Sequence, residues 1–229
     1  MRDGEWLDDE VRRFVRATFF FFPGNCATGR HLIPHILQII SFYMGLLLQR
    51  QRQMEGLNDD AKAPRVHFLN SYFYAKLYSD TQEYDFKPVR RWTTEKKLGY
   101  SLLDCERVVI PLHKGNHWVL GVVDLREKRV SYYDSLKGVD RTCMRNLITW
   151  IVDEAKEKRQ LQWDASEWST DAPQDIPPQL NGCDCGVFTL KYADFLARNA
   201  PLDFSQHDSA FRAASMNLAK ELCKPAHSC

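Results

Sequence analysis

The amino-acid sequence predicts an α+β fold, with a central, mostly antiparallel sheet flanked by helices. Three β-rich runs follow one another between Arg107 and Leu136, separated only by short polar turns, which is typical of adjacent antiparallel strands. Apolar residues recur at helical spacing before this region, in Ile40–Gln53, and after it, in Gly138–Arg159 and Cys185–Ala200. Early helices, a central sheet and late helices together indicate the α+β class.

The first part of the chain alternates between helical and irregular patterns. Asp8 and Asp9 can cap the amides of a first helical turn, but the helical pattern fails in Arg12–Ile39, which is interrupted by prolines and glycines. Helical spacing returns at Ile40. The segments that follow are expected to form a loop, a strand that leads into a helix, and a short helix, in the order Met54–Arg65, Val66–Tyr78 and Asp85–Trp92.

From Arg107 onward the elements are defined more sharply. The three strands are expected at Arg107–His113, His117–Leu125 and Lys128–Leu136. An amphipathic helix follows, then a strand or loop, and finally two more helices, in the order Gly138–Arg159, Gln162–Gln179, Cys185–Ala200 and Ser205–Cys223.

The composition is that of an ordinary globular chain of 229 residues, which suits one large domain or two small ones. Its 31 basic and 30 acidic side chains leave a net charge of +1, so bulk binding to nucleic acid or to an anionic membrane is not expected. The apolar cluster Phe19–Phe22 is too short to span a bilayer, and the first residues lack the apolar core of a secretory signal. The seven cysteines are therefore expected to be reduced thiols.

Cys183 and Cys185, one residue apart, raise three alternatives: a metal site, a disulfide, or a nucleophile with a bystander. Zinc sites usually separate their cysteines by about two to four residues and add a second ligand pair, which is missing here, so we expect no metal or other cofactor. A bond between the two cysteines would close a strained ring. Two structural thiols or one nucleophile remain. The predicted helix start at Cys185, where backbone amides stabilise a thiolate, favours Cys185 as the nucleophile.

Partners for such a nucleophile can also be named. His117 opens one predicted strand and Asp134 closes the next, so an antiparallel hairpin brings them together although 17 residues separate them. Gln179 lies six residues before Cys185, and its amide can donate to a developing oxyanion. Each residue also has a structural alternative: a strand-end histidine, a turn aspartate and a solvated glutamine. Geometry alone indicates a Cys–His–Asp hydrolase.

The segments "HWVLGVVDLREKRVSYYDSL" and "IPPQLNGCDCGVFTLKYADFLAR" resemble the catalytic core of the SUMO-specific (sentrin-specific, ubiquitin-like-protein-specific) cysteine proteases. The resemblance extends to "VRRWTTEKKL", to "WLDDEV" with "ISFYMGLL", and to the late helix that begins "FSQHD". It implies a papain-like cysteine protease fold of the ubiquitin-like-protein protease type. It also implies cleavage after the C-terminal Gly-Gly of a SUMO-like modifier, in precursor processing and in isopeptide deconjugation.

The resemblance assigns a catalytic role to four residues. Cys185 matches the nucleophile, His117 the general base and acid, Asp134 the group that orients the imidazole, and Gln179 the oxyanion donor. Cys183 stands where the family usually has serine, so it is expected to be a bystander. No metal or organic cofactor is implied.

Four further residues match the family's substrate-binding positions. Trp6 and Trp118 match the tryptophans that form a narrow tunnel for the Gly-Gly tail, and Asp9 and Arg91 match residues that dock the folded body of the modifier. The implied partners are a SUMO-like modifier and SUMO-conjugated proteins, without nucleic acid or membrane. The resemblance also implies that the protein is a monomer. It implies localisation in the nucleus, with the cytoplasm as a second compartment.

The segment Arg12–Ile39 departs from the family pattern and leads to further expectations. Removing Arg12–Ile39 joins "WLDDEV" to "ISFYMGLL" in one amphipathic helix, so residues 1–229 are expected to form a single, N-terminally truncated catalytic domain with an insertion at about 12–39. A variant without the insertion is expected to be more soluble and at least as active. The alternatives are a protease for another ubiquitin-like modifier, an acyl transferase, and a modifier-binding pseudo-enzyme. A reactive-tail probe would separate the last from an enzyme.

Overall fold

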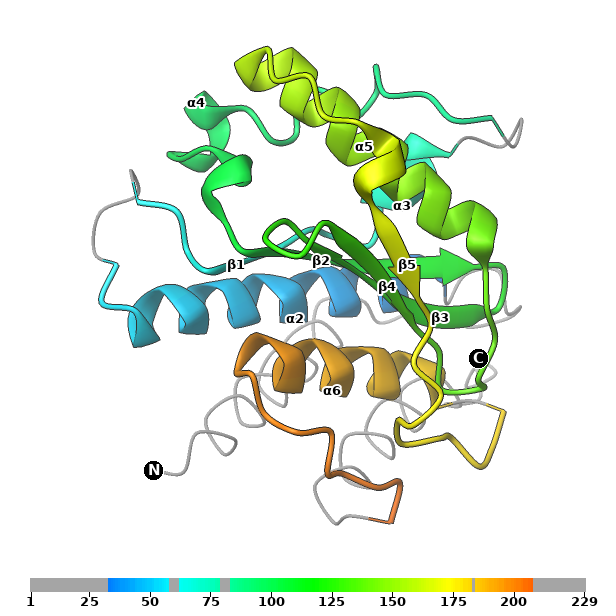
Figure 1. Ribbon diagram of the computed structural model, residues 1–229. Helices are drawn as coiled ribbons and strands as arrows, with labels where there is room; N and C mark the ends of the chain where they lie inside the picture. The colour runs from blue at the N-terminus through cyan, green and yellow to red at the C-terminus, as the bar shows by residue number, and fades with distance from the viewer. Residues whose placement is uncertain (1–32, 58–61, 79–82, 183, 208–229) are drawn as a thin grey trace, which may run out of the picture.

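The computed structural model describes residues 33–57, 62–78, 83–182 and 184–207. Within them a mixed sheet lies between α5 on one face and the pair α2 and α6 on the other (Figure 1). Its strands are β1 (Val66–Phe68), β2 (Arg107–Lys114), β3 (His117–Asp124), β4 (Arg129–Tyr133) and β5 (Ser169–Asp171). The α-helices are α2 (Ile33–Met54), α3 (Phe73–Leu77), α4 (Glu95–Leu98), α5 (Arg141–Arg159) and α6 (Cys185–Ala197).

The sheet confirms the predicted antiparallel centre and adds a short parallel strand at each edge. The strand order is β1-β2-β3-β4-β5, with antiparallel pairing of β2 with β3 and of β3 with β4. β1 pairs with β2 and β5 with β4 in parallel, over three residue pairs each. Parallel neighbouring strands need long connections, so no short turn in the sequence predicts the pairing of β1 or β5.

The β2–β3 hairpin determines where His117 stands. Lys114 pairs with His117 across a loop of only Gly115 and Asn116, and Gly115 adopts a φ of 66° that glycine tolerates without strain. In the β3–β4 pair, Leu120 lies opposite Tyr133. Continuing that register by one residue places the residue after Tyr133 opposite Val119, on the same face of the sheet as His117.

Two hydrophobic cores hold the helices against the sheet. On one face, α6 packs on alternate β3 residues and α2 packs on α6 and β1, and this core buries, among others, Ile40, Leu47, Leu120 and Phe188. On the other face α5 buries Leu147, Trp150 and Ile151 against the strands and α3. The position of α6 beneath the sheet is visible in Figure 1, where the helix starts close to the point at which β4 leaves the sheet.

Helix α2 starts at Ile33, seven residues before the Ile40 start that the spacing predicts. The early start is compatible with Pro34 because the first helical turn has no intrahelical partner for its N–H groups. Ile39 is buried, and Ser71 Oγ donates to the Leu37 carbonyl at 2.8 Å. The last residues of the segment assigned to an insertion thus belong to a packed helix.

Other predicted elements match less closely. Val66–Tyr78 forms the predicted strand and helix, whereas Asp85–Trp92 folds into successive turns rather than a helix, and the short helix α4 follows it. Gln162–Gln179 contains a 3-10 turn, Ala165–Glu167, and the strand β5. The helical turn expected at Asp8 and Asp9 lies outside the described residues, as does most of the helix expected at Ser205–Cys223. None of the described helices has the length and apolar character that a membrane span requires.

Candidate active site

Cys185 is the first residue of α6, and the preceding loop holds it there. The Asp184 backbone N–H donates to Asn181 Oδ1 at 3.1 Å, and Asn181 Nδ2 donates to Asp184 Oδ2 at 2.8 Å. Gln206 Nε2 donates to the same carboxylate oxygen at 2.6 Å. The Asp184 carbonyl then accepts from the Phe188 N–H at 3.0 Å, which starts the helix. The thiol is thereby fixed at the positive end of the helix dipole, which favours a thiolate.

The hairpin brings His117 and Asp134 into contact, as the sequence predicts. His117 Nε2 lies 2.6 Å from Asp134 Oδ1, and the Asp134 side chain is buried. The contact occupies Nε2, so Nδ1 is the imidazole nitrogen that remains for the thiol.

Asp134 is itself held by backbone donors. Its Oδ1 accepts the Leu136 N–H at 2.8 Å, and the Gly138 N–H also donates to the carboxylate. A Cβ at Gly138 would collide with Asp134 Oδ2, so the glycine permits this close approach of the backbone. Burial alone would raise the pKa of Asp134, but the hydrogen bonds from His117, Leu136 and Gly138 outweigh burial and hold the pKa below its ordinary value.

His117 and Cys185 shift each other's pKa in opposite directions. The hydrogen bonds of the imidazole with Asp134, first, and with Cys185 raise the pKa of His117 to about 9 against the opposing effect of burial. Burial would raise the pKa of the Cys185 thiol. The hydrogen bonds from His117 and from the Trp118 and Gly186 backbone N–H groups outweigh it and lower the pKa. The arrangement therefore favours a thiolate–imidazolium pair.

Gln179 is buried beside the triad rather than solvated. Its Oε1 accepts from Ser135 Oγ at 2.7 Å, its backbone N–H donates to the Ser135 carbonyl at 3.0 Å, and its Nε2 donates to the Asn181 carbonyl at 2.6 Å. An amide nitrogen carries two hydrogens, so one N–H of Nε2 can serve another acceptor. The solvated alternative for Gln179 is wrong.

Trp118 lies close to Cys185 both in the backbone and in the core. The backbone N–H of Trp118 donates to the Cys185 thiol. The buried indole of Trp118 belongs to the same hydrophobic cluster as Cys185. The His113 ring, on the neighbouring strand, lies 4.6 Å from the Trp118 ring between centroids. Core packing and a place beside the nucleophile thus coexist at Trp118.

Of the four remaining residues singled out by the sequence, the structure describes only Arg91. Trp6, Asp9 and the bystander Cys183 lie outside the described residues. Arg91 is exposed in the run of turns before α4. The neighbours of Arg91 attach this run to α5: Thr93 Oγ1 donates to a Glu154 carboxylate oxygen and Lys158 Nζ to the Arg90 carbonyl.

Cys105, Cys143 and Cys185 are free thiols, and among the described residues no group of His, Cys, Asp and Glu side chains is placed to hold a metal ion. Burial, as the largest cause, raises the pKa of Cys105 to about 12 and that of Cys143 to about 11, opposite to the shift at Cys185. Of these three thiols, only Cys185 is poised to ionise.

The sequence analysis missed three supporting residues. Ser135 holds Gln179, Asn181 fixes the loop before Cys185, and Gly138 admits the backbone to the Asp134 carboxylate. Asn181 had a signal, since an Asn three residues before an Asp can cap the turn that starts a helix. Ser135 had no local signal, because its partner is 44 residues away.

A thiol at a helix N-terminus, hydrogen-bonded to an imidazole that a buried carboxylate orients, together with this α+β fold, defines a catalytic domain of the cysteine-protease class. The Ulp1 protease family, C-terminal catalytic domain, matches residues 37–226. The chain belongs to the Ulp1 protease family.

Known relatives and structures agree with this assignment. The chain is 43% identical to the ubiquitin-like-specific protease ESD4 of Arabidopsis thaliana over 82% of its own length and 37% of that protein. It is 39% identical to sentrin-specific protease 2 of Rattus norvegicus over 74% of its own length and 27% of the relative. The chain thus spans well under half the length of these two relatives.

The fold matches solved structures over most of the chain. The C-terminal Ulp1 protease domain in complex with Smt3, the yeast ortholog of SUMO, superposes with a TM-score of 0.62 at 24% identity, covering 95% of this chain and 94% of that one. The Ulp1-like SUMO protease catalytic domain of Chaetomium thermophilum gives 0.58 at 21% identity, covering 81% and 67%. At these identities the likeness establishes the fold.

Proposed function

We propose that this protein is a SUMO-specific cysteine protease that cleaves after the C-terminal Gly-Gly of a SUMO-like modifier, in precursor processing and in release of the modifier from a lysine. The observation that carries the proposal is the coupling of His117 and Cys185. The imidazole pKa is raised to about 9, and hydrogen bonds hold the thiol pKa below its ordinary value despite burial. Such an ion pair is the reactive state of a cysteine protease. The names of the relatives supply the substrate class.

In the proposed mechanism the Cys185 thiolate attacks the carbonyl carbon of the terminal glycine and forms a C–S bond. The Cys185 backbone N–H and the Gln179 amide donate to the oxyanion, which returns its electrons as the C–N bond breaks. His117 gives its proton to the leaving lysine amine. It then accepts a proton from the water that cleaves the thioester, and the modifier leaves with a free carboxylate. Asp134 keeps the imidazole oriented throughout.

We infer four substrate contacts from the family resemblance. Trp118 and Trp6 enclose the Gly-Gly tail, and Asp9 and Arg91 dock the body of the modifier. The position of Trp118 beside Cys185 supports the first assignment. The exposure of Arg91 leaves its side chain accessible to a partner.

We also infer that residues 1–229 form one catalytic domain with an insertion at about 12–39, and that the protein acts as a monomer in the nucleus. The family match begins at residue 37, so most of this segment lies outside the matched residues. The start of α2 at Ile33 makes 12–32 the sharper boundary for a deletion, because it leaves the whole of this helix in place.

The test of the proposed function uses two fluorogenic substrates, SUMO and ubiquitin, each carrying a fluorophore on its C-terminal glycine. We expect release from SUMO and far slower release from ubiquitin. Cleavage of the ubiquitin conjugate alone would assign another modifier. A SUMO probe with an electrophilic tail should become covalently attached at Cys185, and binding without attachment would instead indicate a modifier-binding pseudo-enzyme.

A further inference from the structure

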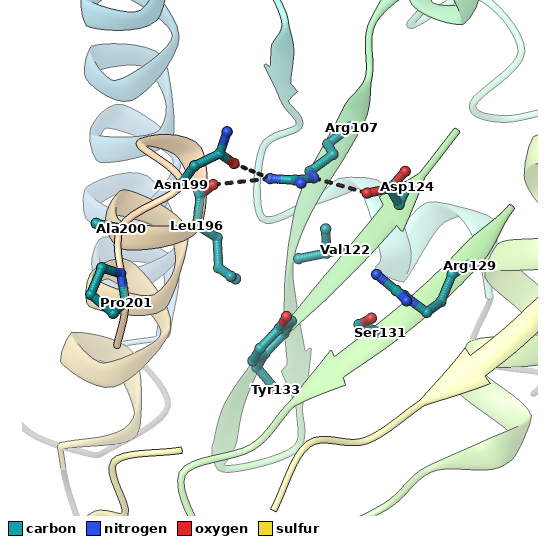
Figure 2. Close-up of a pocket in the computed structure, with 10 residues that line it drawn as sticks. All are labelled: Arg107, Val122, Asp124, Arg129, Ser131, Tyr133, Leu196, Asn199, Ala200 and Pro201. Atoms are coloured by element: carbon teal, nitrogen blue, oxygen red, sulfur yellow. Dashed lines mark hydrogen bonds and ion pairs between the residues drawn. The ribbon is translucent and has the colours of Figure 1, made fainter. Parts of the chain in front are cut away.

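A pocket of about 450 Å³ lies at the far end of the seam between α6 and the sheet (Figure 2). Alternate residues of β4, which share one face of the strand, form one wall: Arg129, Ser131 and Tyr133. The chain after α6, from Asn199 to Pro201, forms the opposite wall. Helix α6 has 13 residues, so the two ends of the helix are about 20 Å apart. The Arg129 and Asn199 end of the pocket therefore lies away from Cys185, whereas Tyr133, at its other edge, directly precedes Asp134.

The one carboxylate that lines the pocket is already neutralised. Asp124 Oδ2 accepts from Arg107 Nε at 2.9 Å, and its Oδ1 accepts the backbone N–H groups of Arg126 and Glu127 at 3.1 and 2.9 Å. Arg107 is fixed further by hydrogen bonds from Nη1 to Asn199 Oδ1 at 2.5 Å and to the Leu196 carbonyl at 3.3 Å (Figure 2). Arg107 and Asp124 thus form a satisfied pair.

Arg129 supplies a positive charge that this pair does not cancel. Its guanidinium extends over the strand toward the pocket (Figure 2), and among the described residues it makes no hydrogen bond or ion pair. The Ser131 and Tyr133 side chains lie on the same strand face, and both line the pocket. The pocket therefore combines the Arg129 guanidinium with two hydroxyl groups, a set that suits an anionic oxygen ligand, while the Asp171 carboxylate, opposite Ser131 on β5, acts on Tyr133 from outside the lining.

The rest of the lining shows which anion fits. Val122, Leu196 and Pro201 add apolar surface, which suits the methylene groups of a side chain better than a bare inorganic ion. We propose that the pocket binds the carboxylate side chain of an acidic peptide segment in a protein partner, with the carboxylate on Arg129. The pocket would then be a docking site that includes none of the catalytic residues, and its binding does not depend on the proposed protease function.

The probe is a fluorescein-labelled peptide of alternating Glu and Leu, and the control is the same peptide with Gln in place of Glu. Fluorescence anisotropy with the full chain should show binding of the acidic peptide alone. Arg129→Gln should weaken binding about tenfold or more, as expected for loss of a hydrogen-bonded ion pair. Arg126→Gln removes the same charge from the same hairpin, outside the pocket lining, and should change affinity less than about twofold.

The proposal would be overturned if Arg129→Gln and Arg126→Gln lost affinity equally, or if the Gln peptide bound as tightly as the Glu peptide. Either result would show that the peptide is not held at one specific site. Inorganic phosphate that competes as strongly as the peptide would also overturn it, in favour of a small-anion site. Amide NMR shifts should localise binding to Ser131 and Asn199, and shifts confined to other regions would contradict it. Arg129→Gln should leave SUMO–fluorophore cleavage unchanged. If the protein does not cleave SUMO–fluorophore but still binds the peptide through Arg129, the proposed protease function is refuted and the proposed docking site stands.

Discussion

The two ends of α6 carry opposite charges for different purposes. At the N-terminal end the helix dipole and backbone amides favour the Cys185 thiolate. At the C-terminal end, Arg65 Nη2 donates to the Ala197 carbonyl at 2.6 Å and Arg107 Nη1 to the Leu196 carbonyl at 3.3 Å. Both ends complement the helix dipole. The N-terminal end carries a reactive anion, and the C-terminal end carries structural cations.

The ends also differ in how completely their polar groups are satisfied. Around Cys185, the buried side chains of Asp134 and Gln179 are hydrogen-bonded. Near the C-terminal end, Arg50 pairs with Asp194 at 2.5 Å, yet its buried Nε and Nη2 have no hydrogen-bond partner among the described residues, and neither has Arg65 Nη1. The reactive end is organised by geometry, whereas the structural end depends on charge pairing. Mutations at the two ends should therefore affect different measurements.

The largest effect is expected at the N-terminal end, from Cys185→Ser. Subtilisin lost about 10⁶-fold in kcat when its nucleophile was replaced, and we expect at least about 10⁴-fold loss of SUMO–fluorophore cleavage here. Binding of the modifier should persist, as measured by anisotropy with labelled SUMO. Cys183→Ser is the control and should keep most activity. The reverse pattern, with Cys183→Ser inactive, would show that the nucleophile is misassigned.

Asp134→Asn should lower kcat by about 10³- to 10⁴-fold, because the amide cannot hold the imidazolium as the carboxylate does. The pH profile gives a sharper test. In the wild type the imidazolium persists up to a pKa of about 9, chiefly through its hydrogen bond to Asp134. Loss of that partner lowers the imidazole pKa, so the alkaline limb of kcat should move to lower pH.

The control for this profile is Asp140→Asn, which alters a carboxylate that caps α5 and pairs with Lys114. It should leave the alkaline limb in place. An Asp134→Asn enzyme with an unchanged alkaline limb would mean that Asp134 does not set the protonation of His117.

At the C-terminal end, Asp194→Ala should act on stability. It leaves the buried Arg50 without its carboxylate and also breaks the 3.1 Å contact with Arg198. Breaking a buried ion pair from one side typically costs about 3–5 kcal/mol in the free energy of unfolding, measurable by urea titration. Asp203→Ala, an exposed change on the segment after α6, should cost far less. The pH profile of the folded Asp194→Ala enzyme should be unchanged, and a shifted profile would show that the two ends of α6 are coupled.

The reactive end could be predicted well because its contacts follow from local structure. Alternating β-rich runs with short turns fix the β2–β3–β4 register, and this register places His117 beside Asp134. The start of α6 at Cys185 follows from apolar residues at helical spacing after a glycine-containing loop.

The structural end could not be predicted, because its contacts join residues far apart in the chain. Arg65 and the Ala197 carbonyl are 132 residues apart, and no spacing rule links them. The parallel pairing of β5 with β4 could not be predicted for the same reason, because the two strands are joined by a long connection rather than by a turn. The early start of α2 differs from the prediction for another reason: prolines in Arg12–Ile39 predict a break in the helix, but proline is tolerated in a first helical turn, where Pro34 stands.

The smallest expected effect concerns how Gln179 is aimed. The Ser135 hydroxyl donates to Gln179 Oε1 at 2.7 Å, which leaves Nε2 as the end of the amide that can reach an oxyanion. Gln179→Ala should lower kcat about a hundredfold.

Ser135→Ala should lower kcat only about fivefold to tenfold, the value of one hydrogen bond of about 1 kcal/mol. Because Ser135 acts through Gln179, the double variant should be no slower than Gln179→Ala alone. Ser131→Ala, a buried serine that contacts Tyr133 instead, should leave kcat unchanged. A double variant slowed by the product of the two losses would show that Ser135 contributes independently of the amide.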